Sequence, residues 1–164
     1  MDFKKLANQY KDELLDNVLP FWLKNSQDHE YGGYFTCLDR EGKVFDTDKF
    51  IWLQGREVWM FSMLYNKVEK RQEWLDCAIQ GGEFLKKCGH DGNYNWYFSL
   101  DRSGRPLVEP YNIFSYTFAT MAFGQISLAT GNQEYANIAK KTFEIILSKV
   151  DNPKGKWNKL HPGT

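Results

Sequence analysis

The sequence predicts an all-α toroid, in which buried inner helices ring a central cavity and half-exposed outer helices surround them. Three observations predict this fold class. The chain carries an internal repeat of about 62 residues, almost wholly apolar helical segments alternate with amphipathic ones, and a turn motif precedes each apolar segment. A repeat unit of this kind buries its apolar face only against its neighbours, so the units are expected to form one continuous domain.

The repeat is clearest in two turn motifs. Leu38–Lys43 (LDREGK) recurs as Leu100–Arg105 (LDRSGR) at an offset of 62 residues, and an aromatic stretch precedes each copy. Asp, Arg and Gly between β-prone runs are turn residues, so each copy is predicted to be a short β-hairpin whose charges are solvated or locally bonded. The similarity continues from 73–78 to 134–139 at an offset of 61. The common order and offset indicate an internal duplication.

Five helices are predicted around these hairpins. Apolar residues at helical spacing indicate a helix over 3–23. Segments 50–68 and 113–129 are mostly apolar, and the first is apolar on nearly every side, which is typical of a helix that is buried all round. Segments 73–87 and 134–150 are amphipathic and are therefore predicted to be outer helices. Each unit thus consists of a hairpin, an inner helix and an outer helix.

The last part of the sequence does not complete this pattern. A third hairpin is predicted to begin at 152–157, but no helix follows it. Extending the period predicts a closed ring of about six helix pairs, an (α/α)6 toroid of roughly 370 residues. Residues 1–164 are accordingly expected to be the N-terminal part of a single barrel domain, about two and a half repeats long, unless association completes the core.

Composition argues against several classes of function. Lys and Arg total 21, as do Asp and Glu, so the net charge is zero and no nucleic-acid partner is expected. No apolar run reaches the length of a membrane span and no signal peptide is evident, so we expect a cytoplasmic protein without a membrane partner. The three cysteines and three histidines lack metal-ligand spacing, so no metal site is predicted.

One cation interrupts the apolar inner segment 50–68. Arg56 follows Trp52 by one helical turn, so the two side chains could share a face. Burying an unpaired cation costs several kcal/mol or more. Arg56 therefore needs either a carboxylate partner, in which case it braces the core, or a polar cavity in which it holds an anionic group.

Longer stretches around these residues resemble a known family. Residues 28–42 (DHEYGGYFTCLDREG), followed by 52–60 (WLQGREVWM), closely resemble the N-terminal region of the N-acylglucosamine 2-epimerase family, and 78–85 and 113–122 fit the same family. The resemblance implies an (α/α)6 barrel that interconverts N-acetylglucosamine and N-acetylmannosamine. It also implies a homodimer in many members, no required cofactor, and ATP as an activator in some. The family includes a protein once described as a renin-binding partner.

The resemblance assigns a role to one residue directly. Arg56 would point into the central cavity near the reacting end of the sugar, where its donors would stabilise developing negative charge. Trp52 could offer a stacking surface on the same face, and Gln54, Tyr111 and Tyr116 are further candidates for substrate contacts. In the family the two histidines that move the proton lie later in the barrel. Residues 1–164 alone are therefore expected to be inactive.

Three other functions remain open on the sequence. The same fold could epimerise or isomerise another sugar, such as a disaccharide. A glycoside hydrolase on an α/α toroid would need two carboxylates across the scissile bond, and the inner helices supply Glu57 but no clear second acid. A non-catalytic interaction module is the third alternative. His29 is expected at a surface turn and His90 at a helix end, rather than in catalysis.

Overall fold

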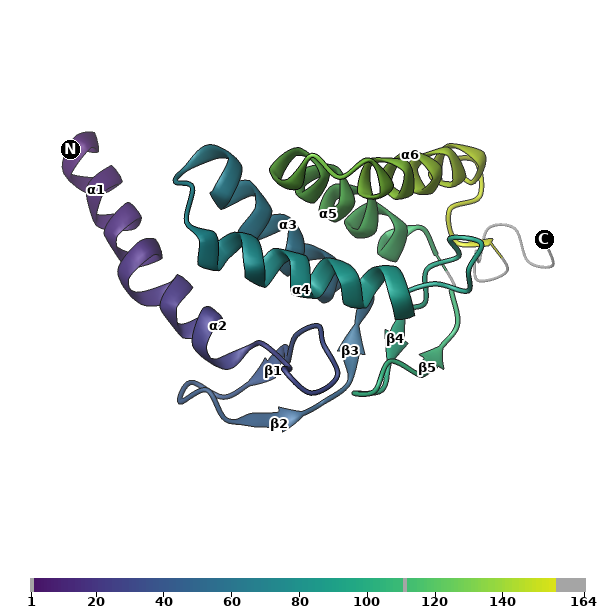
Figure 1. Ribbon diagram of the computed structural model, residues 1–164, viewed down its shortest axis with the longest axis horizontal. Coiled ribbons are helices and arrows are strands. Elements are labelled where there is room, and N and C mark those ends of the chain that lie inside the picture. Colours follow the sequence, from purple (N-terminus) through teal and green to yellow (C-terminus); the bar gives the residue numbers. More distant parts are fainter. Residues whose placement is uncertain (1, 111, 156–164) are drawn as a thin grey trace.

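The computed structural model describes residues 2–110 and 112–155, which form helices and short strands arranged as in Figure 1. The helical segments are α1 (Phe3–Glu13), a π-helical turn (Leu14–Val18), α2 (Leu19–Asn25), α3 (Ile51–Lys67), α4 (Gln72–Cys88), α5 (Phe114–Thr130) and α6 (Gln133–Ser148). The strands are β1 (Cys37–Leu38), β2 (Val44–Asp46), β3 (Lys49–Phe50), β4 (Ser99–Leu100) and β5 (Pro106–Val108). The four helices predicted after residue 50 are confirmed, with ends that differ by two residues at most.

The N-terminal helix is interrupted, whereas the sequence predicted a single helix over 3–23. The Leu19 N–H donates to the carbonyl of Leu14, five residues back, and closes a π-helical turn. Pro20 follows directly and has no N–H to continue the α-helical pattern, which accounts for the wider turn at this point. α1 extends away from the other helices (Figure 1), and its apolar side chains, such as Phe3 and Tyr10, are exposed.

The inner helices α3 and α5 pack against each other, and α4 and α6 pack against them as outer helices (Figure 1). The inner pair approaches closely at Gly55, where a Cβ atom would lie 3.0 Å from the main chain of Phe118. α3 is not buried all round, so that prediction was wrong. One side of α3 carries the exposed Arg56 and the half-buried Trp59, where the helix borders a cavity shared with α2 rather than a closely packed helix.

The duplication is also visible in the core. Tyr34 and Trp96 occupy equivalent positions 62 residues apart, and both side chains are fully buried. Each ring reaches the outer helix of its unit with a hydrogen bond at its polar tip. The Tyr34 hydroxyl donates to the Cys77 carbonyl (2.7 Å), and Trp96 Nε1 donates to Thr142 Oγ1 (3.1 Å). A large aromatic residue with a satisfied polar tip therefore anchors each hairpin beneath its outer helix.

Two hairpins form as predicted, β1 with β2 and β4 with β5, both antiparallel. Their turns are built alike: Asp39 Oδ1 accepts the Lys43 N–H (2.8 Å), and Asp101 Oδ1 accepts the Arg105 N–H (2.9 Å). β3 adds a contact that the sequence did not indicate, since it pairs with β4 and so joins the start of α3 to the second hairpin. The third hairpin was predicted to begin at 152–157; the described part of that segment, 152–155, contains no strand, and the rest lies outside the described residues.

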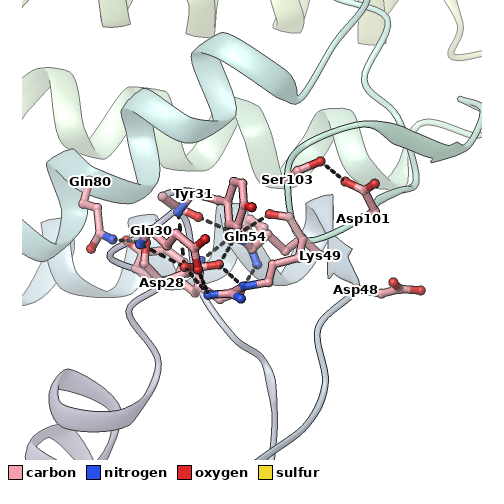
Figure 2. Close-up of polar contacts among 12 residues, drawn as sticks. Asp28, Glu30, Tyr31, Asp48, Lys49, Gln54, Gln80, Asp101 and Ser103 are labelled. Carbon is pink, nitrogen blue, oxygen red and sulfur yellow. Dashed lines mark hydrogen bonds and ion pairs between the residues drawn. The ribbon is translucent and has the colours of Figure 1, made fainter.

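A buried ion cluster holds the hairpin end together (Figure 2). Asp28 and Lys49 are fully buried and form an ion pair of 3.0 Å. The Lys49 ammonium also donates to the carbonyls of Gly32 (2.6 Å) and Arg102 (2.9 Å). The Arg102 guanidinium donates to both carboxylate oxygens of Asp28, at 3.0 and 3.2 Å. The prediction that the Arg102 charge is solvated or bonded within its own turn was therefore wrong.

The charge on Asp28 is strongly favoured by this arrangement. Burial alone would raise the pKa of its carboxyl, but hydrogen bonds from Arg102 and Lys49 outweigh burial and lower the pKa to about 2. The cluster joins the loop after α2, the strand that leads into α3, and the second hairpin turn. It therefore fixes the start of the helix that carries Arg56.

Candidate active site at Arg56

Arg56 lies in the second turn of α3 and is exposed. No hydrogen bond or ion pair to its guanidinium forms among residues 2–110 and 112–155. The described part of the chain therefore gives no support to the alternative that Arg56 braces the core through a carboxylate. Its five donors are free to bind a group from outside this part of the chain.

Arg56 borders a cavity of about 370 Å³ between α2, the segment before β1, and α3. The walls are mostly apolar, with Trp22 from α2 and Trp59 from α3 among them. Among the described residues, the lining consists of Trp22, Thr36, Leu53, Arg56, Glu57, Trp59 and Met60. A cation among aromatic and aliphatic side chains suits a ligand with both an apolar face and a polar or anionic group.

Glu57 is the acid in this cavity, and the sequence weighed it only as half of a hydrolase pair. Its side chain is buried, and Ser26 Oγ lies 2.5 Å from Glu57 Oε1. Burial raises the pKa of Glu57 to about 8, against a smaller opposite effect of the hydrogen bond with Ser26. No second carboxylate lines the cavity among the described residues, so the pair that glycoside hydrolysis needs is not assembled here.

Trp52 lies on the side of α3 that faces α5. Its ring is half-buried and packs against Phe114 and Phe118, with centroid separations of 5.7 and 5.8 Å. It does not line the cavity that Arg56 borders, and Trp59 and Trp22 are the tryptophans that do. The sequence places Trp59 on the same cavity-lining helix as Arg56, one turn after it, but assigns Trp22 to packing rather than to the cavity.

Gln54 is fully buried, and its side-chain amide forms two hydrogen bonds with the backbone of Tyr34. Its oxygen accepts the Tyr34 N–H at 2.8 Å, and its nitrogen donates to the Tyr34 carbonyl at 2.9 Å. This pair of bonds gives an irregular loop the pairing that a strand partner would otherwise supply. Figure 2 shows Gln54 beside the ion cluster. The geometry gives Gln54 a structural role.

Tyr116 lines a different cavity, of about 460 Å³, at the N-terminal end of α5. Its ring is buried, and its hydroxyl accepts a hydrogen bond from Lys149 Nζ (2.8 Å) and donates to Asn95 Oδ1 (3.3 Å). Burial raises the pKa of Tyr116 to about 12, so the hydroxyl stays protonated at neutral pH. Tyr111, the remaining candidate, lies outside the described residues.

The histidines that the structure describes do not border Arg56. His29 is exposed in the loop after α2, as predicted. His90 follows α4, stacks on Tyr94, and accepts the Gly92 N–H through Nδ1. Burial lowers the pKa of His90, so its neutral form is favoured. His161 lies outside the described residues.

Within residues 2–110 and 112–155, no group of three or more His, Cys, Asp or Glu side chains comes close enough to hold a metal ion. In the same part of the chain, every helix is too short or too polar to cross a membrane.

Comparison with known proteins places this site in a family. The family model for N-acylglucosamine 2-epimerase (GlcNAc 2-epimerase) matches residues 33–163. The N-acylglucosamine 2-epimerase of Bos taurus is 42% identical over 162 residues, which cover 91% of this chain and 36% of the bovine protein. The cellobiose 2-epimerase of Dictyoglomus turgidum is 28% identical over 167 residues, which cover 96% of this chain and 42% of that protein. The chain thus spans about two fifths or less of the length of these relatives.

A solved structure agrees with the sequence matches. The cellobiose 2-epimerase from Bacillus thermoamylovorans B4167 superposes with a TM-score of 0.80 at 28% identity, over 89% of this chain and 38% of that chain. The likeness confirms the predicted (α/α)6 toroid, of which the described helices form an incomplete portion. Together with the match over 33–163, it shows that the chain belongs to the N-acylglucosamine 2-epimerase family.

Proposed function

We propose that the protein is a sugar epimerase that interconverts N-acetylglucosamine and N-acetylmannosamine. The observation that carries the proposal is Arg56, an unpaired guanidinium beside a largely apolar cavity in a chain of this family. The acylated amino sugar is favoured over a disaccharide because identity to the bovine N-acylglucosamine 2-epimerase is 42%, against 28% for the Dictyoglomus cellobiose 2-epimerase.

The chemistry explains why a free arginine suits this reaction. Carbon 2 of the open-chain sugar lies next to the carbonyl, so a base can remove its proton and leave an enediolate-like intermediate. Negative charge then develops on the carbonyl oxygen, where fixed guanidinium donors would stabilise it. Return of a proton to the opposite face inverts carbon 2. Two acid/base groups with pKa values near neutrality must do this, and histidine suits both steps.

Several parts of the proposal rest on the family resemblance. The acid/base histidines would lie beyond residue 164, and neither His29 nor His90 borders Arg56. The reaction as written needs no cofactor, and ATP would act as an activator without being consumed. In this proposal the protein is cytoplasmic and forms a homodimer. Trp52 would contact substrate only from the α5 side of the exposed face, where its ring is half-buried.

Hydrogen exchange at carbon 2 tests the proposal directly. We expect the complete protein, incubated with N-acetylmannosamine in deuterated water, to form N-acetylglucosamine that carries deuterium at carbon 2. Proton NMR follows the loss of the carbon 2 proton signal and the appearance of the second sugar. Formation of the product without deuterium, or no product at all, would contradict proton removal and return by this protein.

A second candidate is epimerisation of a disaccharide, which the likeness to a solved cellobiose 2-epimerase favours. The same NMR experiment with cellobiose distinguishes the two. Faster exchange with N-acetylmannosamine supports epimerisation of the acylated amino sugar. Faster exchange with cellobiose supports epimerisation of the disaccharide instead. Hydrolysis would release free glucose from cellobiose and would support the glycosidase alternative instead.

A further inference from the structure

The proposed reaction leaves Glu57 without a role, although this buried acid borders the same cavity as Arg56. Its side chain is 7% exposed, and it forms no ion pair with any residue that the structure describes. Burying an unpaired carboxylate is costly, whereas a protonated carboxyl can be buried if its hydrogen bonds are satisfied. The hydrogen bonds of Glu57 therefore bear on whether its carboxyl is protonated.

The hydrogen bonds around Ser26 decide that state. Ser26 Oγ lies 2.5 Å from Glu57 Oε1 and 2.7 Å from the carbonyl oxygen of Trp22. The serine hydroxyl has a single hydrogen, and a carbonyl oxygen has none to donate. Two close contacts between oxygens need two hydrogens. If Ser26 donates to Trp22, the second hydrogen must come from the carboxyl of Glu57.

The neighbouring titratable groups do not oppose this assignment. Glu57 contacts the C-terminal end of α2 through Ser26, and the Tyr34 hydroxyl before the first hairpin and the Cys77 thiol on α4 interact electrostatically with it. Burial raises the pKa of both, so both are neutral at physiological pH. On α3 itself, Arg56 borders the cavity as an exposed side chain. No described cation bonds to Glu57 and stabilises its ionised form.

We propose that Glu57 is a neutral carboxylic acid at physiological pH and serves as a positioning residue for Arg56. Its O–H donates to Ser26 and fastens the second turn of α3 to the end of α2. Because it carries no charge, it can be buried between α2 and α3 without a counterion, next in sequence to Arg56. The positioning role rests on the proposed epimerase function, whereas the protonation state does not.

The proposal has one consequence at high pH, where Glu57 ionises. Ionisation would leave Ser26 with one hydrogen for two acceptors, the Trp22 carbonyl and the Glu57 carboxylate, and would place an unpaired charge in the buried contact between α2 and α3. The second turn of α3, which carries Arg56, would then be held less firmly against the end of α2. Catalysis should therefore weaken as Glu57 ionises, and a glutamine at this position should prevent the effect because its amide can donate but cannot ionise.

Carbon NMR on the protein labelled at glutamate Cδ tests the protonation state. The Glu57 signal is assigned through bonds in the unsubstituted protein and checked by its absence in Glu57→Gln. We expect the chemical shift of a protonated carboxyl at pH 7 and a titration centred near pH 8. A carboxylate shift at pH 7 would overturn the proposal, because the hydrogen between Glu57 and Ser26 would then belong to the serine.

The pH dependence of turnover tests the positioning role. The complete protein should lose turnover about tenfold between pH 7 and pH 9, since about a tenth of Glu57 stays protonated one unit above its pKa. Glu57→Gln should keep turnover within about twofold over this range. Glu83→Gln is the matched control, because Glu83 pairs with Lys86 at 2.9 Å and its ionised form is already favoured. It should decline as the unsubstituted protein does.

The outcomes separate the two proposals. If Glu57→Gln shows the same decline as the unsubstituted protein, Glu57 does not position Arg56. If the complete protein epimerises no sugar at pH 7, the proposed function and the positioning role both fail. The carbon NMR result then still decides whether Glu57 is a neutral acid.

Discussion

Asp28→Asn is expected to destabilise the fold by about 3–5 kcal/mol, the cost of breaking a buried ion pair from one side. The substitution barely changes the shape of the side chain, but it leaves the fully buried Lys49 without its counterion. Arg102 loses the same partner. Urea unfolding followed by far-ultraviolet circular dichroism measures the effect. The matched control is Glu41→Gln, which removes a carboxylate from the exposed pair with Arg40 and should cost less than about 1 kcal/mol.

The double variant Asp28→Asn with Lys49→Met provides a second check. It leaves no unpaired charge where the ion pair was, so it should recover part of the stability that Asp28→Asn loses. If Asp28→Asn costs less than about 1 kcal/mol, the cluster does not hold the hairpin end and the inference from its burial is wrong.

Lowering the pH should weaken the same ion cluster in the unsubstituted protein. The pKa of Asp28 is lowered from 3.8 to about 2 in the folded state, so its carboxylate stabilises the fold above pH 4 and this contribution is lost as pH falls toward 2. The loss amounts to about 2 kcal/mol from this one group. Urea unfolding at pH 5, 4, 3 and 2 measures it. Asp28→Asn, which has no carboxylate at this position, should show a correspondingly shallower decline.

The repeat and the helices could be predicted because their signals are local. The turn around Asp101 depends on residues within four positions of it, and the helix over 114–130 depends on spacing within one segment. The ion cluster could not be predicted in this way. Arg102 and Asp28 lie 74 residues apart, and nothing near either residue identifies its partner. Lys49 likewise stands in a polar stretch of sequence, yet it is completely buried.

The candidate site was predicted only in part, for a related reason. Helical spacing relates Arg56 to its neighbours on α3, but it could not tell which part of the fold each flanking side chain would meet. Trp52 turns toward Phe114 on α5, and Trp59 borders the cavity instead. Gln54 pairs with the backbone of Tyr34, a contact across 20 residues. The periodicity of one helix defines its faces, and only packing decides what each face contacts.

Arg56→Ala is expected to lower the turnover number about 10²–10³-fold, the loss typical for removing one donor to a developing oxyanion. The same substitution should leave thermal unfolding unchanged, because the side chain is exposed and bonds to no described residue. Arg40→Ala is the control: Arg40 is 92% exposed in the first hairpin turn, and its loss should change turnover less than twofold. Arg56→Lys should fall between the two, since it keeps the charge but loses the planar fork of donors.

The kinetic form of the loss distinguishes two roles for Arg56. If the guanidinium acts on the transition state, Arg56→Ala should lower kcat and kcat/KM together, and exchange of the carbon 2 proton should slow by the same factor. If it only holds the sugar, KM should rise while kcat stays constant. A kcat within tenfold of the unsubstituted protein would contradict oxyanion stabilisation. Because folding does not depend on this side chain, either result reports on chemistry at the cavity rather than on loss of the native structure.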